Sequence, residues 1–321
     1  MASLAQDLEF WMTRLPPRLR STPIIQLAIP GSHDSTTHVL TKKSDVAPDA
    51  DPIIRFLKFL KPILGPVVCR WSKTQAVDIK TQLQNGIRYF DLRIATKKTT
   101  SQFYFVHKLY AECVDRVFEH IKCFLDAHPE EIVILDCQHF YDLSAKDHER
   151  FIAFIVATFG PKLLPCSESM THLTLDHITK KCKSQVILIY RNKQMSRQFL
   201  WPSACFPTPW PNTTSISYLL NFLSRGLTHR NFSVGFVSQC VLTPTVWYAF
   251  TNLFSSLKNR CALPLAPEKQ NWLKRQSPGK GGINIVICDF VDYQAYQFCK
   301  EVVNLNLKLL ETTDEQFPVA D

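Results

Sequence analysis

The chain of 321 residues is 45% hydrophobic, enough to bury one large core or two smaller ones. Its formal net charge of +9 favours an anionic partner, such as a phosphorylated ligand, an anionic membrane face or nucleic acid. No basic run is dense enough for a nucleic-acid-binding arm, and no apolar run reaches the roughly 18 residues of a membrane span. We therefore expect no nucleic-acid partner and no transmembrane segment.

The eleven cysteines are odd in number and scattered, and no two stand at Cys-x-x-Cys spacing. This pattern argues against a disulfide framework and a cysteine zinc site. Cys123, Cys137, Cys240 and Cys288 lie in apolar runs, where a reduced cysteine packs as a small hydrophobe. The first ten residues contain acids and lack an apolar stretch, so they do not form a signal peptide. We expect a cytoplasmic protein of a reducing compartment.

The first predicted elements lie at the N-terminus. Residues 1–20 should form a helical segment, with a short helix over Leu8–Leu15 that Pro16 and Pro17 end. A buried strand is predicted over Ile24–Ile29, and Pro30-Gly31 should stop it.

Directly after this stop, His33 and Asp34 stand side by side. A strand that ends in a turn and presents these two side chains suits enzymes whose chemistry lies at the carboxyl ends of strands. The alternative is a turn in which Asp34 caps the next segment and His33 is merely polar.

The segment Ile53–Val68 is apolar and carries Arg55, Lys58 and Lys61 on one side. Prolines and a glycine interrupt its helical spacing, so any helix here should be short or broken. We prefer a helix packed on the domain, but an interfacial segment that contacts an anionic membrane surface is the alternative.

The rest of the chain alternates between strands and helices. Helices are predicted over Asp78–Asn85, Val114–Ala127, Asp147–Phe159 and from about Tyr293 to Leu310, and strands over Tyr89–Ile94, Phe103–Val106, Glu131–Leu135, Val186–Tyr190, Phe232–Val241 and Ile283–Cys288. A stiff loop rich in Trp and Pro should separate two of these elements, over Leu200–Pro211. The alternation predicts a single-domain α/β fold, a distorted (β/α)8-like TIM-type barrel over residues 21–312, followed by a flexible acidic tail over 313–321.

Charged side chains stand at or near the ends of the predicted strands, and a parallel barrel brings such ends to one mouth. They are His33, Asp34, Asp91, Arg93, His107, Asp136, Arg191 and Asp289. Two histidines can serve as general base and general acid near neutral pH, and an arginine can hold a phosphate and offset its charge. Neighbouring carboxylates can orient the imidazoles. The set suits phosphoryl transfer.

A divalent metal site is the main rival, because the same histidines and carboxylates could ligate an ion. However, Arg93 shares a strand face with Asp91, where its guanidinium competes with a cation for the same carboxylate. We therefore favour chemistry with no metal and no cofactor.

Four stretches of the sequence carry a family resemblance. They are Ala28-Ile29-Pro30-Gly31-Ser32-His33-Asp34-Ser35, Gly86-Ile87-Arg88-Tyr89-Phe90-Asp91-Leu92-Arg93, Phe105-Val106-His107 and Asn284-Ile285-Val286-Ile287-Cys288-Asp289-Phe290. With them, from about Trp11 to Leu310, the chain resembles the phosphatidylinositol-specific phospholipase C X-domain-containing proteins, a small animal group related to bacterial phosphatidylinositol phospholipases C.

The resemblance implies a role for each of five residues. His33 would be the general base that deprotonates the inositol 2-hydroxyl, and Asp289 would orient it. Arg93 would bind the phosphate, while His107, assisted by Asp34, would protonate the diacylglycerol leaving oxygen. The products would be diacylglycerol and an inositol 1,2-cyclic phosphate, which water can open.

The resemblance also bears on the substrate and on metals. Arg191 resembles a headgroup-contacting position, and we expect Asp136 to bind substrate beside it. Asp34 and Arg93 stand where the calcium-dependent eukaryotic enzymes have an asparagine and acidic calcium ligands, which implies calcium-independent hydrolysis. Lys108 departs from the glycine that usually follows the second histidine.

The partner implied is phosphatidylinositol at an anionic membrane surface, met peripherally and transiently. The candidate contacts are Ile53–Val68 and the Trp201–Trp210 loop. Two alternatives stay open: a catalytically weak or inactive lipid-binding or scaffold protein on the same fold, and a metal-dependent glycerophosphodiesterase, whose acidic ligand pattern we do not find.

Overall fold

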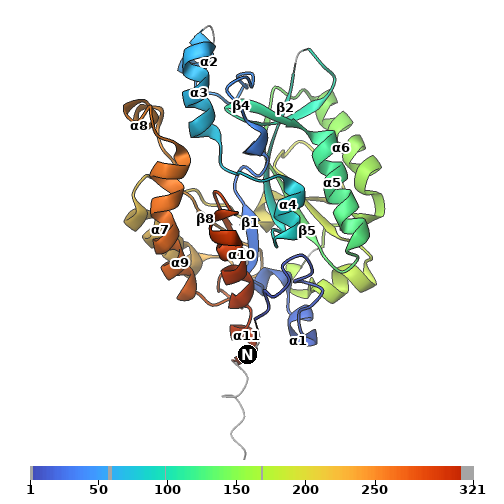
Figure 1. Cartoon of the computed structure of the whole chain (residues 1–321). Coiled ribbons are helices and arrows are strands. Elements are labelled where there is room, and N and C mark those ends of the chain that lie inside the picture. The colour runs from blue at the N-terminus through green and yellow to red at the C-terminus, as the bar shows by residue number, and fades with distance from the viewer. Residues whose placement is uncertain (1–2, 57–59, 98, 168, 312–321) are drawn as a thin grey trace, which may run out of the picture.

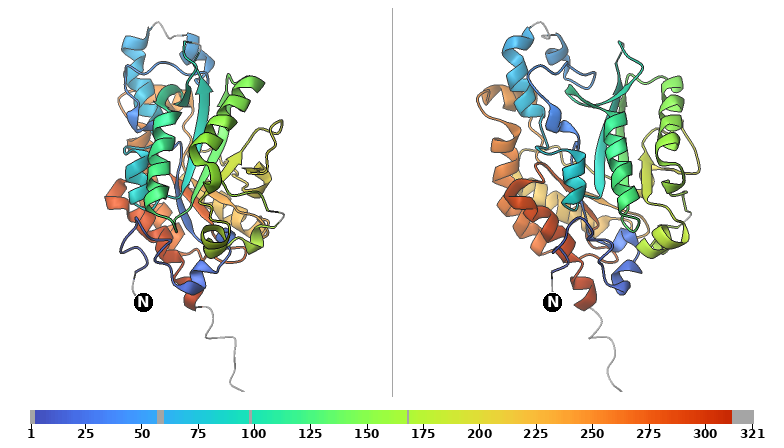
Figure 2. Two further views of the ribbon diagram at one scale, coloured as in Figure 1. Left: turned by 90° about the vertical axis from the view of Figure 1, so that its right-hand side faces the viewer. Right: turned by 45° about the vertical axis from the view of Figure 1, so that its right-hand side comes forward.

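Parallel strands form the inner layer of the molecule and helices form the outer layer (Figures 1 and 2). The computed structural model describes residues 3–56, 60–97, 99–167 and 169–311. The strands are β1 Ile29–Ser32, β2 Tyr89–Thr96, β3 Phe103–His107, β4 Leu109–Cys113, β5 Val133–Tyr141, β6 Val186–Tyr190, β7 Leu200–Trp201, β8 Val237–Cys240 and β9 Ile285–Cys288. Their order is β7-β6-β5-β2-β1-β9-β8, with β3 paired antiparallel to β2 and β4 paired antiparallel to β3.

The sheet curls into a barrel whose ladder does not close. Within the described residues, no strand pairing joins β7 to β8. Instead, the N–H groups of Gly235 and Val237 donate to the carbonyls of Cys205 and Pro207, in the segment after β7. The predicted single-domain α/β fold with a distorted barrel is confirmed, and an irregular segment covers the seam.

Helices surround the sheet and cover its outer face. They are α1 Pro17–Arg20, α2 Pro52–Phe56, α3 Lys61–Ser72, α4 Ile79–Gln84, α5 Val114–Ala127, α6 Ala145–Phe159, α7 Ile216–His229, α8 Val246–Thr251, α9 Leu263–Lys274, α10 Tyr293–Leu305 and α11 Lys308–Glu311. The prediction for α5 is confirmed in its bounds, because its large apolar residues recur at helical spacing and are buried.

The prediction for the first strand was wrong in its bounds, because the strand lies later in the chain. Ile24–Gln26 forms a 3-10 turn, and β1 contains Pro30 and Gly31 rather than stopping at them. The N–H groups of Ile29 and His33 donate toward β9, so Pro30 lacks a donor only on the side of β2, where pairing begins one residue later. A Cβ on Gly31 would lie 2.9 Å from Ile287 and from Tyr89, so the neighbouring strands require glycine here.

The N-terminal helix prediction was also wrong. Residues 8–15 form hydrogen-bonded turns, and the helix begins at Pro17, a residue suited to the first helical position. Trp11 is nevertheless buried, and its indole N–H donates to the Gly86 carbonyl at 3.0 Å. The N-terminal segment thus packs beneath the sheet.

Five further differences concern the rest of the chain. β5 continues to Tyr141 instead of ending at Leu135, and β8 occupies only part of the strand predicted there. Trp201 belongs to β7 and is buried rather than in a loop. Cys123 is exposed, not packed. The last helix is divided into α10 and α11.

The described part of the chain contains no helix that is long and apolar enough to cross a membrane. The acidic tail predicted over 313–321 lies outside the described residues, as do positions 57–59 of the apolar segment Ile53–Val68.

Candidate active site

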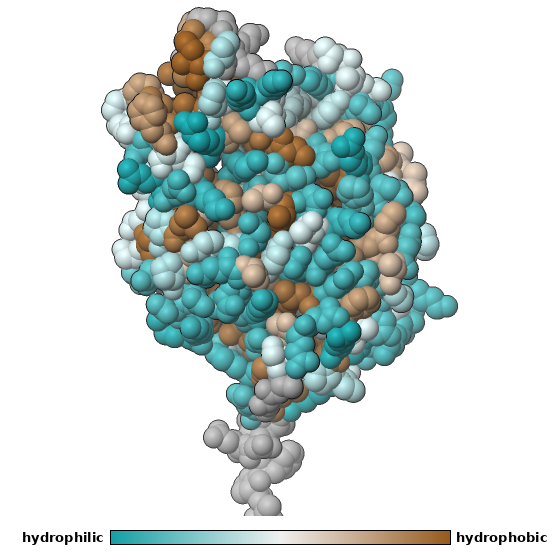
Figure 3. Space-filling model, in the orientation of Figure 1, coloured by the Kyte–Doolittle hydropathy of each residue, from teal (hydrophilic) through white to brown (hydrophobic). Residues whose placement is uncertain are grey.

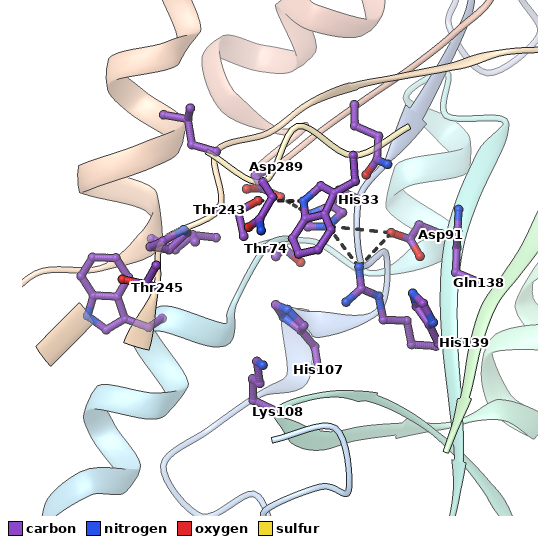
Figure 4. Close-up of a pocket in the computed structure, with 18 of the residues that line it drawn as sticks. His33, Thr74, Asp91, His107, Lys108, Gln138, His139, Thr243, Thr245 and Asp289 are labelled. Atoms are coloured by element: carbon purple, nitrogen blue, oxygen red, sulfur yellow. Dashed lines mark hydrogen bonds and ion pairs between the residues drawn. The ribbon is translucent and has the colours of Figure 1, made fainter. Parts of the chain in front are cut away.

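His33 follows β1 at the barrel mouth and contacts a carboxylate through each ring nitrogen (Figure 4). Its Nδ1 lies 2.7 Å from Oδ1 of Asp289, which directly follows β9. Burial alone would lower the pKa of His33. The negative charges of Asp34, Asp289 and Asp91 outweigh this effect and raise the pKa to about 9. At neutral pH the free protein therefore holds His33 as an imidazolium.

Asp34 stands at the centre of the site with 3% of its surface exposed. Its Oδ1 lies 2.5 Å from Arg93 Nε, and its Oδ2 lies 3.3 Å from His33 Nε2 and 3.1 Å from His107 Nε2. The contact with Arg93 is an ion pair without good hydrogen-bond geometry. Burial raises the pKa of Asp34 to about 6 although Arg93 and His33 oppose the shift.

Arg93 projects into the cavity from the middle of β2, on the same face as Asp91, as the alternation predicts. Its guanidinium lies 3.3 Å from His33 Nε2 and 3.6 Å from Asp91 Oδ2. Burial would raise the pKa of Asp91, but Arg93 and His33 lower it below the usual value. Arg93 is thus held among anions and next to the space that a ligand would enter.

His107 reaches the site by a route that the parallel-barrel argument did not include. β3 runs antiparallel to β2, with Phe105 opposite Ile94, so the chain returns from the mouth to the level of Arg93. Its Nδ1 donates to the Ser72 carbonyl at 2.7 Å, which fixes the hydrogen on that nitrogen.

His107 and Asp34 form a pair that shares protons. Burial, and then the positive charge of Arg93, lower the pKa of His107 to about 4. Its Nε2 lone pair would repel the facing Asp34 oxygen unless a proton lies between them. The His33 and His107 rings, with centroids 6.3 Å apart, flank the Arg93–Asp34 pair.

A short buried segment after α3 braces the catalytic elements, and sequence reasoning missed it. Thr74 Oγ1 donates to the Asp34 carbonyl, and the Phe290 N–H donates to the Thr74 carbonyl. The Gln75 amide donates to the carbonyls of His33 and Cys288 at 2.9 Å each. We call Ser72, Thr74 and Gln75 together the brace. Because Ser72 binds His107 and Gln75 binds the His33 carbonyl, the brace contacts both catalytic histidines. Because side-chain to backbone bonds of this kind follow no periodic pattern, the sequence gives no signal for them.

Three residues at these loops have a positive φ: Asp34 at 39°, Lys108 at 60° and Phe290 at 50°. Such backbone conformations cost free energy in residues other than glycine and cluster at functional sites. At Lys108, where the resembling family usually has glycine, the N–H donates to Asp49 Oδ2 at 2.7 Å and the ammonium lies 3.0 Å from Asp51. These bonds hold the lysine in a conformation that glycine adopts freely.

The structure places Asp136 and Arg191 behind the cavity wall. Arg191 binds both carboxylate oxygens of Asp136 at 2.8 and 2.7 Å, and the Tyr89 hydroxyl donates to Asp136 at 2.6 Å. Neither of the two is among the described residues that line the cavity. Gln138, which does line it, donates to Asp136 at 3.1 Å. Their predicted substrate-binding role stays a prediction, and any such role would pass through Gln138.

The site opens into a cavity of about 670 Å³. Besides the charged groups, much of its wall consists of polar side chains that sequence reasoning missed, including Thr74, Gln138, His139, Thr208, Asn212, Gln239 and Thr243. The continuation of β5 to Tyr141 supplies part of this wall. A wall of hydroxyl, amide and imidazole groups suits a ligand rich in hydroxyls.

The metal alternative has a geometric basis, since ligand atoms of His33, Asp34 and Asp91 all lie within 4.8 Å of one another. Arg93, however, already places its positive charge against the two carboxylates. A divalent ion held by the same oxygens would lie beside the guanidinium, and the two charges would repel. The charge distribution therefore favours an anionic ligand.

Comparison with known proteins identifies relatives over most of the chain. It is 38% identical over 301 residues to PI-PLC X domain-containing protein 2 of Mus musculus, covering 92% of this chain and 87% of the relative. It is 36% identical over 310 residues to PI-PLC X domain-containing protein 1 of Homo sapiens, covering 94% and 93%. No family model matches the chain.

Two bacterial proteins of known structure have the same fold. A variant of the phosphatidylinositol-specific phospholipase C from Staphylococcus aureus superposes with a TM-score of 0.67 at 18% identity, over 95% of this chain and 98% of that chain. The phosphatidylinositol-specific phospholipase C from Listeria monocytogenes superposes with a TM-score of 0.62 at 17% identity, over 94% and 99%. At this identity the likeness shows the fold.

The Asp289→Asn variant tests the electrostatics of the site. Because the Asp289 carboxylate stabilises the imidazolium, we expect NMR titration to give His33 a pKa near 9 in the wild type and a clearly lower pKa in the variant. The cavity-lining Asp51→Asn variant, which removes a carboxylate bound to Lys108, should leave the His33 pKa unchanged.

Protein stability should follow with a defined sign. A raised pKa in the folded state stabilises the protein fully below the unfolded value of 6.5, and this contribution is lost as the pH rises through about 9. The stability advantage of the wild type over Asp289→Asn in urea unfolding should therefore shrink across that window. An advantage that grows with pH would contradict the assignment.

Proposed function

The chain belongs to the family of PI-PLC X domain-containing proteins, and from this premise we propose that it hydrolyses phosphatidylinositol as a metal-independent phosphodiesterase. Its fold is that of the bacterial phosphatidylinositol-specific phospholipases C. The observation that carries the proposal is the arrangement around Asp34, in which two histidines flank an arginine at the foot of a polar cavity.

Each residue has a definite task in the proposed first step. Neutral His33 accepts the proton of the inositol 2-hydroxyl at Nε2, and that oxygen attacks phosphorus. The new phosphorus–oxygen bond forms while the bond to the diacylglycerol oxygen breaks, and the leaving oxygen receives a proton from the Asp34–His107 pair. Arg93 binds the non-bridging oxygens and offsets their growing charge. The products are diacylglycerol and inositol 1,2-cyclic phosphate.

In the proposed second step water opens the cyclic phosphate. His107 accepts the proton of the attacking water, and His33 returns the proton it took to the 2-oxygen. The ring phosphorus–oxygen bond breaks, which gives an inositol phosphate and restores the first protonation state. The two histidines therefore exchange roles between the steps.

The resting protonation state of the site is the reverse of the one that the first step uses. His33, the base, holds its proton up to about pH 9, while Asp34 begins to lose its proton near pH 6. Turnover should still depend on pH with a bell shape when the base has a higher pKa than the acid. The reason is that the reactive form and the resting form carry the same total number of protons. Only a small fraction of molecules is reactive at a given moment, and each contains a strong base.

The key test measures release of water-soluble inositol phosphates from phosphatidylinositol vesicles. We expect turnover in EGTA equal to that with added calcium, because Arg93 provides the positive charge. His33→Ala and His107→Ala should each lower turnover by at least about 100-fold, the usual contribution of a general acid or base. Gln276→Ala, remote from the cavity lining, serves as a matched surface control.

Three other outcomes would each contradict part of the proposal. Turnover that needs calcium would move the carboxylates into metal-ligand roles. Turnover that survives both histidine substitutions would remove them from the chemistry. Binding to phosphatidylinositol without turnover would favour the alternative, a lipid-binding or scaffold protein on this fold.

Exposed apolar side chains around the mouth support peripheral contact with a membrane. Ile63 of α3 is 72% exposed, Trp247 of α8 is 71% exposed, and Phe254 shortly after α8 is fully exposed. In Figure 3 the hydrophobic surface gathers at the upper left, over α3 and α8. Of the two segments predicted to contact a membrane, the first supplies Ile63. In the second, Trp201 is buried and Trp210 is exposed.

The double variant Trp247→Ser/Phe254→Ser tests this contact. Burying an aromatic side chain in lipid is worth about 1.5–3 kcal/mol, so we expect sedimentation with phosphatidylinositol-containing vesicles to weaken at least about tenfold. Phe232→Ser, which alters an exposed aromatic residue before the amino end of β8, should leave binding unchanged. Equal loss in both proteins, or none in the double variant, would refute the assignment.

A further inference from the structure

A second, apolar hollow lies beside the catalytic cavity, between α3 and α8. It measures about 200 Å³. Leu64, Val67 and Val68 of α3 line one side, and Ala249 and Phe250 of α8 line the other. We call it the α3–α8 groove. Apolar walls of this kind suit the hydrocarbon part of a ligand.

The groove adjoins the catalytic cavity, because six residues line both. They are Asp51, Trp71, Lys108, Pro244, Thr245 and Val246. In Figure 4, Lys108 lies near His107. The groove is therefore the apolar space next to a ligand bound in the cavity.

The junction lies on the side of one particular catalytic group. Ser72 lines the groove, and its carbonyl accepts the hydrogen bond from His107 Nδ1. His107 thus stands where the polar cavity passes into the apolar groove. His33, on the far side of Arg93, lines the cavity and not the groove.

We propose that the α3–α8 groove binds one acyl chain of the substrate lipid. This inference rests on the proposed function, in which His107 protonates the diacylglycerol oxygen. The leaving group must then lie on the His107 side, and the groove is the apolar space that begins there. The inositol ring lies on the opposite side, against the polar wall.

The charged residues at the junction agree with this placement. Lys108 and Asp51 form an ion pair at 3.0 Å where the two spaces meet. Both residues line the cavity and the groove. In the proposed binding mode, the glycerol and ester oxygens of the lipid would pass the ammonium and the carboxylate of this pair, and the acyl chain would continue between the apolar walls. The substrate class is therefore a lipid phosphodiester with at least one acyl chain drawn from the bilayer into the protein.

The expected consequence is a dependence of catalysis on chain length, even without a membrane. Each buried methylene favours binding by roughly fourfold, so the two methylenes that one chain gains from dibutanoyl to dihexanoyl phosphatidylinositol should raise kcat/KM about 15-fold. Both lipids are used as monomers, below their micelle concentrations, which excludes effects of the exposed membrane-facing residues.

Ala249→Phe fills the groove, and we expect it to abolish this chain-length dependence. Thr251→Phe adds the same ring to an exposed position of α8 that lines neither space, and it should behave like the wild type. Hydrolysis of inositol 1,2-cyclic phosphate, which has no acyl chain, should be equal in all three proteins and shows that the variants are folded.

Each outcome decides the proposal. Equal kcat/KM for the two lipids in the wild type, or a chain-length dependence that persists in Ala249→Phe, would overturn it. If no protein turns over either substrate, the proposed function fails, and calorimetric binding of the same two lipids decides about the groove. Tighter binding of the dihexanoyl lipid in the wild type but not in Ala249→Phe would support the groove, and equal binding would refute it.

Discussion

The electrostatic constraint on which the site depends is the burial of three carboxylates at one barrel mouth. Asp34, Asp91 and Asp289 are each at most 6% exposed, and Arg93 and protonated His33 offset their charges. Separating these charges from water is costly unless each has a partner. The same arrangement holds His33 charged, holds Arg93 beside the cavity and places Asp34 in contact with His107. A phosphodiester adds a negative charge that this site is able to receive.

The sequence predicted which residues meet at the site better than how the chain brings them there. His33, Arg93 and Asp289 come together as expected, because parallel strands carry their side chains to a common edge. His107 also arrives, but on a strand that runs the other way, which the apolar pattern of Phe103–Val106 could not distinguish. Asp136 and Arg191 satisfy each other behind the wall, since a strand-end position does not reveal whether a charge faces a ligand or a partner.

Features that depend on tertiary contacts were not predictable. The brace at Ser72, Thr74 and Gln75 acts through carbonyl and amide groups at positions far along the chain, with no periodic signature. Pro30-Gly31 suggested the end of a strand, but the space between Ile287 and Tyr89 makes it the middle of one. The apolar faces of α3 and α8 become one groove only because the fold places them side by side (Figure 1).

In the proposed mechanism, an internal hydroxyl of the substrate, activated by His33, attacks phosphorus at a site in which Arg93, and not a metal, provides the positive charge. Phosphorus NMR of phosphatidylinositol incubated with the protein in EGTA tests it most directly. We expect inositol 1,2-cyclic phosphate to appear first and to decline later as inositol phosphate accumulates. Inositol phosphate without a cyclic precursor, or a cyclic product that forms only when calcium is added, would contradict it.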